Sequence, residues 1–211
     1  MPMNTLSGAR IRQPTRRSMA KQATREKILT SARDLFTLKG YEGATIRDIA
    51  SAAGMSTGAV FANFNDKAEL FSEILDDRTD VLVSSMREAA TGTTAEARLL
   101  NLFVGGYQFN FGDLPLLQAA MSVSWSPVHG PEQRRQGGHD KVVGVISEVI
   151  EQAILDGGLI STAPATRLAK MLWDLFLASF HRASFAEWNM DEMHETMRGH
   201  IDIVLSSFRA R

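Results

Sequence analysis

The stretch "TIRDIASAAGMSTGAVFANFNDKAEL", residues 45–70, decides the fold class, because it reads as two short helices joined by a tight turn. Thr45 can cap the first of these helices, and Gly54 is the residue type that ends a helix in the left-handed conformation. Ser56 or Thr57 can cap the next helix. Two short helices across a three- to four-residue turn that contains glycine form a helix-turn-helix.

A further helix precedes this pair. Thr24 is its expected N-cap and Gly40 its expected C-terminal residue, because apolar residues recur at helical spacing between them. Asp48, three residues into the second helix, completes a weak variant of the capping box, and Asp66 can cap a fourth helix. The predicted helices run to about residue 39, over 46–53 and over 57–63.

The rest of the chain also predicts helices, and no segment alternates as a strand does. The first 20 residues have no apolar period and read as a flexible basic arm. Residues 126–138 read as a loop or a frayed helix start. The fold class is therefore all-α. The helices predicted after the helix-turn-helix span 66–90, 93–111, 113–125, 139–156, 162–185 and 191–209.

Composition excludes several classes of site. The 211 residues include no cysteine, which excludes a disulfide scaffold, thiolate zinc sites and a cysteine nucleophile, and fits the cytoplasm as the expected location. The most apolar run, residues 168–180, is interrupted by Lys170 and Asp174 and is too short to span a membrane. The N-terminus has no signal-peptide core; its lack of acidic residues up to residue 25 leaves a transit peptide as an alternative to the basic arm.

The net charge of −1 conceals an asymmetry along the chain. Residues 1–33 hold eight Lys and Arg against one Glu, and residues 1–71 hold eleven against six Asp and Glu. The remainder is therefore acidic. A basic N-terminal part and an acidic remainder indicate two functions, and the basic part is expected to bind a polyanion.

At this point the sequence resembles the TetR family of transcriptional regulators. The resemblance lies in "TREKILTSARDLFTLKGYEGATIRDIASAAGMSTGAVFANFNDKAELF", residues 24–71, about a quarter of the chain. It implies a three-helix helix-turn-helix DNA-binding domain at 21–66, behind the arm at 1–20, and a helical ligand-binding and dimerisation domain at 67–211. It also implies a homodimer that binds a near-palindromic double-stranded DNA operator and is released by a small-molecule effector.

Several residues are expected to face DNA. The hydroxyl of Thr45 and the free amides of its helix can hold a phosphate, or Thr45 is a plain N-cap. Arg47 matches a family position that reaches a base edge, where arginine can grip guanine; the alternative is a solvated helix charge. In the recognition helix, Thr57 is the best candidate to meet a base. The small residues at its leading end are Ser56, Thr57, Gly58 and Ala59, and Ala59 serves equally well for helix crossing.

Two positions depart from the family pattern. Phe61 stands where the family commonly has a tyrosine that donates to phosphate, so a contact worth about 0.5–1.5 kcal/mol is expected to be absent. Asn63 stands where histidine or tyrosine is common, and it reaches less far to phosphate or adenine. Lys67 matches the family's lysine at the start of the fourth helix, either as a phosphate clamp or as a surface lysine.

The arm is a candidate replacement for the missing donor. Arg16 and Arg17, with Arg10 and Arg12 before them, can follow the phosphate backbone or enter a minor groove.

Aromatic and methionine residues gather in two parts of the second domain, and most such residues in a helical domain form ordinary core. Tyr107, Trp125 and His129 are the preferred ligand-binding candidates, because each has an apolar body and a polar tip. Met121 and Trp173 belong to the same clusters. The expected effector is small and largely apolar.

Asp174 stands out because it interrupts an apolar stretch. It is a candidate counter-charge for a cationic ligand, although pairing with a nearby Lys or Arg is the plainer reading.

The last two helices are expected to form the dimer interface as a four-helix bundle. Only some of their apolar positions can face the partner. The candidates are Leu168, Met171, Leu172, Leu175, Ser179, Arg182, Ile201, Val204, Leu205 and Phe208.

Enzyme motifs are missing from the sequence: there is no phosphate-binding glycine loop with lysine, no nucleophile elbow and no HExxH. The five histidines show no paired metal-ligand spacing. We expect no enzyme activity, no metal and no cofactor. The alternative to a DNA-binding regulator is a helical protein–protein interaction module with a degenerate helix-turn-helix, against which the basic arm, Arg47 and Lys67 argue.

Overall fold

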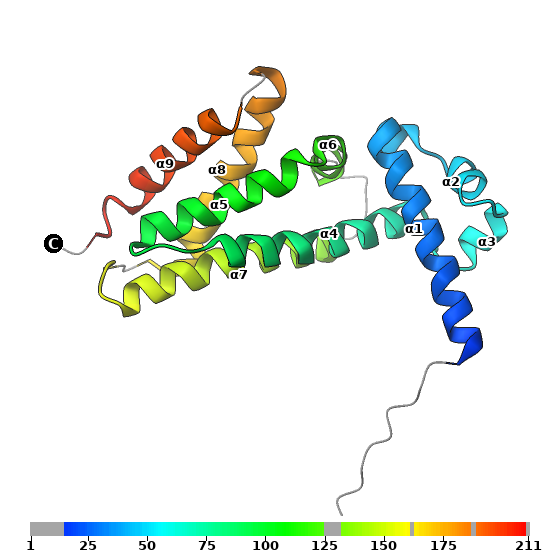
Figure 1. Cartoon of the computed structure of the whole chain (residues 1–211), viewed down its shortest axis with the longest axis horizontal. Helices are drawn as coiled ribbons and strands as arrows, with labels where there is room; N and C mark the ends of the chain where they lie inside the picture. The colour runs from blue at the N-terminus through cyan, green and yellow to red at the C-terminus, as the bar shows by residue number, and fades with distance from the viewer. Residues whose placement is uncertain (1–14, 125–131, 161–162, 187–188, 210–211) are drawn as a thin grey trace, which may run out of the picture.

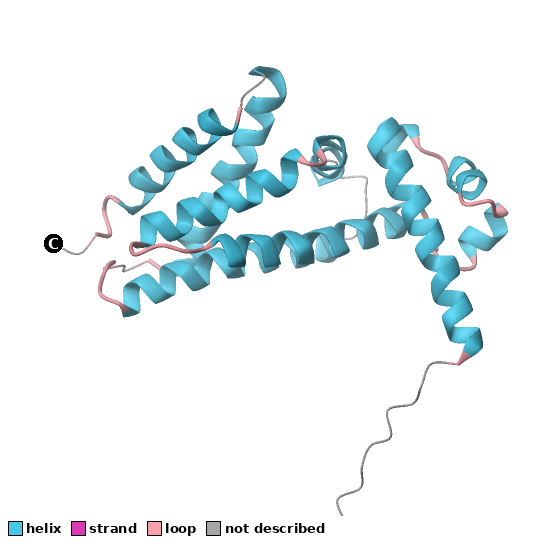
Figure 2. Ribbon diagram, viewed as in Figure 1, coloured by secondary structure: helices cyan, strands magenta, loops and turns pink. Residues whose placement is uncertain are grey.

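The computed structural model describes residues 15–124, 132–160, 163–186 and 189–209, and within them the chain is almost entirely helical (Figures 1 and 2). Extended pairing in this part of the chain is a single isolated bridge between Leu159 and Arg209. The all-α prediction is confirmed. The helices are α1 Arg16–Gly43, α2 Ile46–Ala52, α3 Thr57–Phe61, α4 Lys67–Ala89, α5 Ala95–Phe111, α6 Leu114–Ser124, α7 Glu132–Leu155, α8 Ala165–Ala186 and α9 Met190–Leu205.

Helices α1 to α3 lie at one end of the molecule, and α4 runs from that end along the remaining helices (Figure 1). Helices α5 and α7 pack against α4, α8 packs against α7 and α9, and α9 packs against α5. None of the described helices is long and apolar enough to cross a membrane.

Helix α1 begins earlier than predicted. Its N-cap is Thr15, whose hydroxyl accepts a hydrogen bond from the Ser18 amide, whereas Thr24 lies inside the helix and donates to the Ala20 carbonyl. The expected cap at Thr24 is therefore wrong, and so is the flexible arm for residues 16–20; residues 1–14 lie outside the described part. The extra turns are exposed and need no apolar stripe, so apolar spacing gave no sign of them, although their Arg, Lys, Gln and Ala favour helix.

The predicted ends of the next helices hold. Gly40 adopts φ of 71° and breaks the regular helix before its last turn, and Gly54 adopts φ of 64° between α2 and α3. Thr45 and Asp48 form a full capping box on α2. The side chains of Ser56 and Asp66 cap α3 and α4.

The first core joins the helix-turn-helix to its neighbours. Its centre is an aromatic triad in which Phe36 and Phe71 meet edge to face at 4.9 Å and Tyr41 lies against both rings. The start of α4 and the α6 residues Leu116 and Ala119 complete this core, so the first domain packs against elements beyond residue 66. The domain division after residue 66 stays a prediction.

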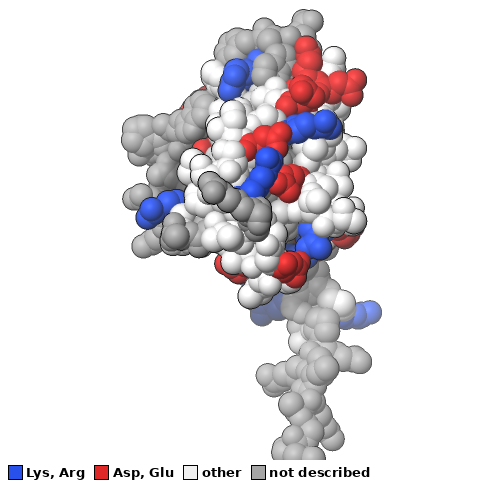
Figure 3. Space-filling model, turned by 90° about the vertical axis from the view of Figure 1, so that its left-hand side faces the viewer, with Lys and Arg blue, Asp and Glu red and all other residues white. Residues whose placement is uncertain are grey.

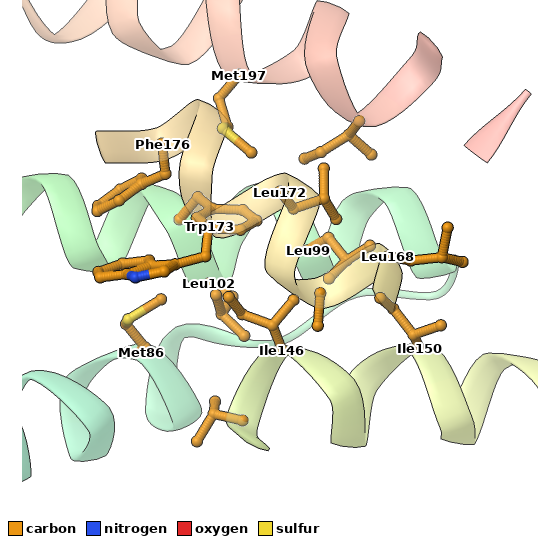
Figure 4. Close-up of a cluster of buried hydrophobic side chains, with 14 of the residues drawn as sticks. Met86, Leu99, Leu102, Ile146, Ile150, Leu168, Leu172, Trp173, Phe176 and Met197 are labelled. Carbon is orange, nitrogen blue, oxygen red and sulfur yellow. The ribbon is translucent and has the colours of Figure 1, made fainter. Parts of the chain in front are cut away.

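The second core lies among α4, α5, α7, α8 and α9 (Figure 4). Trp173 stacks on Phe176 at 5.1 Å, and Phe176 stacks on Tyr107 at 4.5 Å. Gly105 lets α5 approach α4 closely, because a Cβ there would lie 2.7 Å from the Cβ of Ala89. Gly106 gives room to the ring of Phe176 in the same way, with a 3.1 Å contact.

Two C-terminal helix boundaries differ from prediction. Helix α7 starts at Glu132 instead of residue 139, so residues 132–138, predicted as part of a loop or a frayed helix start, are helical. A Cβ built on Gly138 would lie 3.4 Å from the Thr79 hydroxyl on α4. Helix α9 ends at Leu205, and the Ile160 amide then donates to the Phe208 carbonyl at 2.6 Å, which ties the chain's end to the α7–α8 turn.

Candidate nucleic-acid interface

The leading end of α3 is bare, in the sense that its first residues have small, exposed side chains. Ser56 uses its hydroxyl as the N-cap and accepts from the Ala59 amide at 3.2 Å, while Thr57 and Gly58 are exposed and the Thr57 hydroxyl has no partner among the described residues. A Cβ built on Gly58 would meet only the Ser56 hydroxyl, at 3.8 Å. The fold therefore does not require glycine here.

Arg47 projects from the first turn of α2 and is exposed. Its guanidinium has no ion-pair or hydrogen-bond partner in the described chain, unlike Arg25 and Arg78, which are both engaged. An unpartnered guanidinium close to the recognition helix is able to bind a base edge or a phosphate.

Thr45 is less free than the sequence suggests. Its hydroxyl donates to the Asp48 carboxylate at 2.9 Å and accepts from the Asp48 amide at 3.1 Å, and Lys39 approaches the same carboxylate at 3.4 Å. Bonds from the Thr45 hydroxyl and amide, with Lys39 beside them, lower the pKa of Asp48. A carboxylate already occupies this helix N-terminus, so a phosphate would have to approach against it.

The far end of α3 divides into an exposed and an inward side. Phe61 is 55% exposed, which leaves its ring available to a partner, and Ala59 is half-buried. Asn63 turns inward: its side-chain amide nitrogen donates to the Ala59 carbonyl at 2.9 Å, and its side-chain oxygen Oδ1 is buried without a partner, unlike its backbone carbonyl. The structure gives Asn63 no outward contact group, so its DNA role stays a prediction that this geometry does not favour.

Lys67 points into its own chain. Its ammonium donates to the carbonyls of Tyr41 and Ala44, at 2.9 and 3.3 Å, and lies 4.2 Å from the centre of the Tyr41 ring. Glu42 approaches it at 4.0 Å. Lys67 therefore fastens α4 to the α1–α2 connection, and one of its three protons at most remains for a phosphate.

Arg25 was not singled out from the sequence. It forms an ion pair with Glu73, donates to the Asn63 carbonyl at 2.6 Å and stacks 4.1 Å above the Phe64 ring. It thereby holds the end of α3 and the start of α4 against α1. Its partners lie 38 to 48 residues away, and no local pattern signals such a pairing.

The ligand-binding candidates do not gather at one open site. Trp173 is buried, Met121 is half-buried against the second core, and Asp174 is exposed. The exposure of Asp174 opposes its role as a pocket anion, and its pairing with a nearby Lys or Arg stays a prediction. Trp125 and His129 lie outside the described residues.

Tyr107 is the exception among these candidates. It is completely buried between Phe176 and Phe180, and its hydroxyl has no partner at hydrogen-bonding distance. Burial raises the pKa of Tyr107 to about 12, and the Ser179 hydroxyl on α8 opposes the rise. Ser179 gives its own proton to the Leu175 carbonyl, so its oxygen remains able to accept.

A second buried polar group lies where α4 meets the α5–α6 connection. Arg78 donates to the Asn110 side chain at 2.9 Å, lies 3.5 Å from Asp113 and stacks 4.5 Å above the Phe109 ring. Asn110 donates in turn to the Gly106 carbonyl. Burial lowers the pKa of Arg78, and Asp113 opposes that shift.

The end of the molecule remote from α1–α3 has mixed charge (Figure 3). Arg209 bridges Glu96 and Asp202 at 2.9 and 2.6 Å beside a small pocket between α5 and α9. Positive and negative side chains are mixed at this end, whereas residues 1–33 carry eight Lys and Arg against one Glu. The described residues also contain no cluster of three or more His, Asp or Glu side chains that could hold a metal.

The expected dimer residues separate into two groups. On α8, Met171 is 48% exposed, Arg182 is exposed and Leu175 is half-buried; α9 adds Ile203, which is 74% exposed and was not predicted. The half-buried Phe208 packs against the second core. The predicted interface residues that are instead buried in their own chain are Leu168, Leu172, Ser179, Ile201, Val204 and Leu205.

Comparison with known proteins identifies the N-terminal part of the chain. Residues 28–74 match the sequence model of the family described as "Bacterial regulatory proteins, tetR family". The HTH-type transcriptional repressor KstR2 of Rhodococcus jostii is 33% identical over 96 residues, 45% of this chain and 47% of KstR2. The HTH-type transcriptional repressor AcnR of Corynebacterium efficiens is 50% identical over 48 residues, 23% of this chain and 26% of AcnR.

The solved structures extend the likeness to the whole fold. The chain matches SmeT, the repressor of the Stenotrophomonas maltophilia multidrug efflux pump SmeDEF, with a TM-score of 0.69 and 22% identity over 90% of this chain and 92% of SmeT. It matches the TetR family transcriptional regulator PfmR of Thermus thermophilus with a TM-score of 0.62 and 20% identity over 85% and 97%.

The chain spans less than half the length of these curated relatives, so their sequence likeness concerns mainly the helix-turn-helix. At 20–22% identity the structural likeness shows the fold alone. The family match and the named repressors together show that residues 28–74 resemble the helix-turn-helix of the tetR family of bacterial regulatory proteins, and the chain shares its fold with SmeT and PfmR.

Proposed function

We propose that this chain is a transcriptional regulator that binds double-stranded DNA, most simply a repressor that a small effector releases from a palindromic operator. One observation carries the proposal: α3 presents a bare leading end beside an unpartnered Arg47, while the surrounding cations Arg25 and Lys67 are used to hold the unit together. Arg47 makes no ion pair or hydrogen bond with the described residues, so its guanidinium is available to a base edge or a phosphate.

The matched relatives support the repressor part of the proposal, since KstR2 and AcnR are both named as transcriptional repressors. The buried Tyr107 hydroxyl supports the effector part. A hydroxyl held in an aromatic core without a partner costs free energy, and a small molecule that enters the core can satisfy it.

A homodimer through α8 and α9 completes the proposal. The apolar side chains of Met171 and Ile203 are exposed on these two helices, and burying them against a second copy would stabilise the pair. Two recognition helices related by a two-fold axis would then read two half-sites.

Selection of duplexes from random-sequence DNA with the full chain tests this function. We expect one palindromic sequence to be enriched, and Arg47→Ala to weaken binding to it in a direct titration. Arg87→Gln is the matched control, because Arg87 pairs with Glu148 in an exposed ion pair far along α4. Enrichment of no sequence would overturn the proposal and favour a protein–protein interaction module.

A further inference from the structure

The first three turns of α1 form a basic ledge, which we define as the side chains of Arg16, Arg17, Lys21 and Lys27. All residues from 15 to 23 are exposed, so this end of the helix is not buried against the part of the chain that the structure describes. In Figure 1 it stands clear of the helices around α4.

None of the four cations of the ledge has an ion-pair partner among the described residues. The acidic residue nearby, Glu26, accepts instead from Gln22 at 3.1 Å. The first turn of α1 has no acidic side chain, although a helix N-terminus is stabilised by negative charge and destabilised by positive charge. Arg16 and Arg17 therefore work against the stability of their own helix, which indicates that their charge serves a partner.

Two cations of the ledge, Arg16 and Lys27, lie on the side of α1 that faces the α2–α3 turn. Arg17 and Lys21 lie about 100° and about 140° around the helix from Arg16. A Cβ built on Gly54, in the turn that leads into α3, would lie 3.8 Å from the ammonium of Lys27. Arg16 lies eleven residues before Lys27, about three full turns, so both share one face of α1 within about 20°. Ala20 and Ala23 lie between them on that face and leave it unobstructed.

We propose that this ledge binds the phosphate backbone of the duplex outside the half-site that α3 reads. The distance from Arg16 to Lys27 along the helix is about 16 Å, which matches about five base pairs at 3.4 Å each. The ledge is a helix with fixed spacing, so it fits a regular row of phosphates better than a flexible arm does. The proposal rests on the proposed DNA-binding function.

The test compares salt dependence on two duplexes. One carries the selected half-sites with flanks of ten base pairs, and the other is trimmed to the half-sites. For the double variant Arg16→Gln/Lys27→Gln we expect a flatter salt slope on the long duplex, by about 0.9 for each phosphate that the variant no longer neutralises. Between 50 and 200 mM salt, the drop in affinity then shrinks about 3.5-fold for each such phosphate. On the trimmed duplex the glutamine variant and the unchanged chain should have the same salt slope.

Two further variants exclude other causes. Arg16→Lys/Lys27→Arg keeps both charges and should keep the slope. Arg87→Gln/Lys141→Gln removes two charges from exposed ion pairs on α4 and α7 and should leave the flank dependence intact. Circular dichroism checks that α1 remains helical in each variant.

The outcomes separate this proposal from the proposed function. Specific binding with equal slopes for the unchanged chain and the glutamine variant would overturn the ledge and leave the regulator standing. If no sequence is enriched, the proposed regulator is overturned, and the ledge proposal falls with it because it needs a selected half-site.

Discussion

The two ends of this molecule leave different polar groups without partners. At the α1–α3 end the guanidinium of Arg47 and the hydroxyl of Thr57 are exposed and have no partner among the described residues, and only the side-chain oxygen of Asn63 there is buried without one. In the second core the hydroxyl of Tyr107 is fully buried without a partner, and on α9 the Nδ1 atom of His200 is also buried without one.

The difference has an energetic meaning. An exposed donor costs nothing in the free protein, because water satisfies it, and it suits a large polar partner that arrives from outside. A buried donor without a partner costs free energy until something enters the core to bond it. The α1–α3 end is therefore suited to a large polar partner and the second core to a small molecule, and substitutions at each end can test that difference.

Arg47→Ala should have the largest effect on the DNA-binding end. Removal of an arginine that grips a guanine costs about 1–3 kcal/mol of discrimination, so the preference for the selected sequence should fall about 5- to 150-fold. Competition titrations with a duplex mutated at one base pair measure it. The melting temperature should not change, because Arg47 is exposed and makes no ion pair or hydrogen bond with the described residues. An unchanged preference would return Arg47 to a solvated helix charge.

The fold of this end was predictable because each feature has a local signature. Capping residues stand three positions from the amides they cap, as with Thr45 and Ser56, and left-handed positions need glycine, as with Gly40 and Gly54. The start of α1 was missed because its exposed turns have no apolar stripe. The inward turn of Asn63 and Lys67 was missed because it depends on carbonyl groups that only the fold brings near.

The paired changes Gly54→Ala and Gly58→Ala separate a glycine needed by the fold from one needed by a partner. Gly54 has φ of 64°, so alanine there should destabilise the chain by about 1–2 kcal/mol. Gly58 is helical with an unobstructed Cβ position, so alanine should stabilise by about 0.5–1 kcal/mol. Chemical denaturation measures both changes.

Operator titration completes the pair. Gly58→Ala should bind DNA more weakly although it is the more stable protein, because its methyl group would stand between α3 and the groove. Unchanged binding would show that the leading end of α3 does not approach DNA closely.

Tyr107→Phe examines the other end. Phenylalanine keeps the stacking on Phe176 and removes the unpartnered hydroxyl, so the free protein should gain about 1 kcal/mol of stability. For a chain of this length the melting temperature should rise by about 2–4 °C. A loss of stability would mean that the hydroxyl is already satisfied, with Ser179 as the natural acceptor.

The same variant has a pH signature. The pKa of Tyr107 is raised to about 12 by burial, so the folded state keeps its proton more firmly than the unfolded chain, whose tyrosine titrates near about 10. The stability from this group is complete below about pH 10 and is lost as the pH rises toward about 12. In Tyr107→Phe the free energy of unfolding should therefore fall less steeply between about pH 10 and about pH 12 than in the unchanged chain. Tyr41, whose pKa is raised by burial and by Glu42 and Asp66, remains as an internal reference.

The candidate effector site was only partly predictable. Aromatic residues at helical spacing do predict a core, and Trp173 and Tyr107 are in it. Spacing gives no means to tell that Asp174 is exposed, or that Arg78 meets Asn110 from 32 residues away. Such pairings depend on how helices cross, and helix crossing has no short sequence signature.

Phe61→Tyr should have the smallest effect and returns to the recognition helix. The ring of Phe61 is 55% exposed, so an added hydroxyl has room and the fold should not change. If the ring lies along the DNA backbone, the hydroxyl gains a phosphate contact at a wet interface, worth about 0.5 kcal/mol, or roughly a twofold tighter operator complex. The gain should be similar for specific and random duplexes, because phosphates carry no base sequence. Weaker binding of Phe61→Tyr to both duplexes would mean that the ring packs against an apolar part of the groove, such as a thymine methyl group, where a hydroxyl would lose its water without gaining a partner.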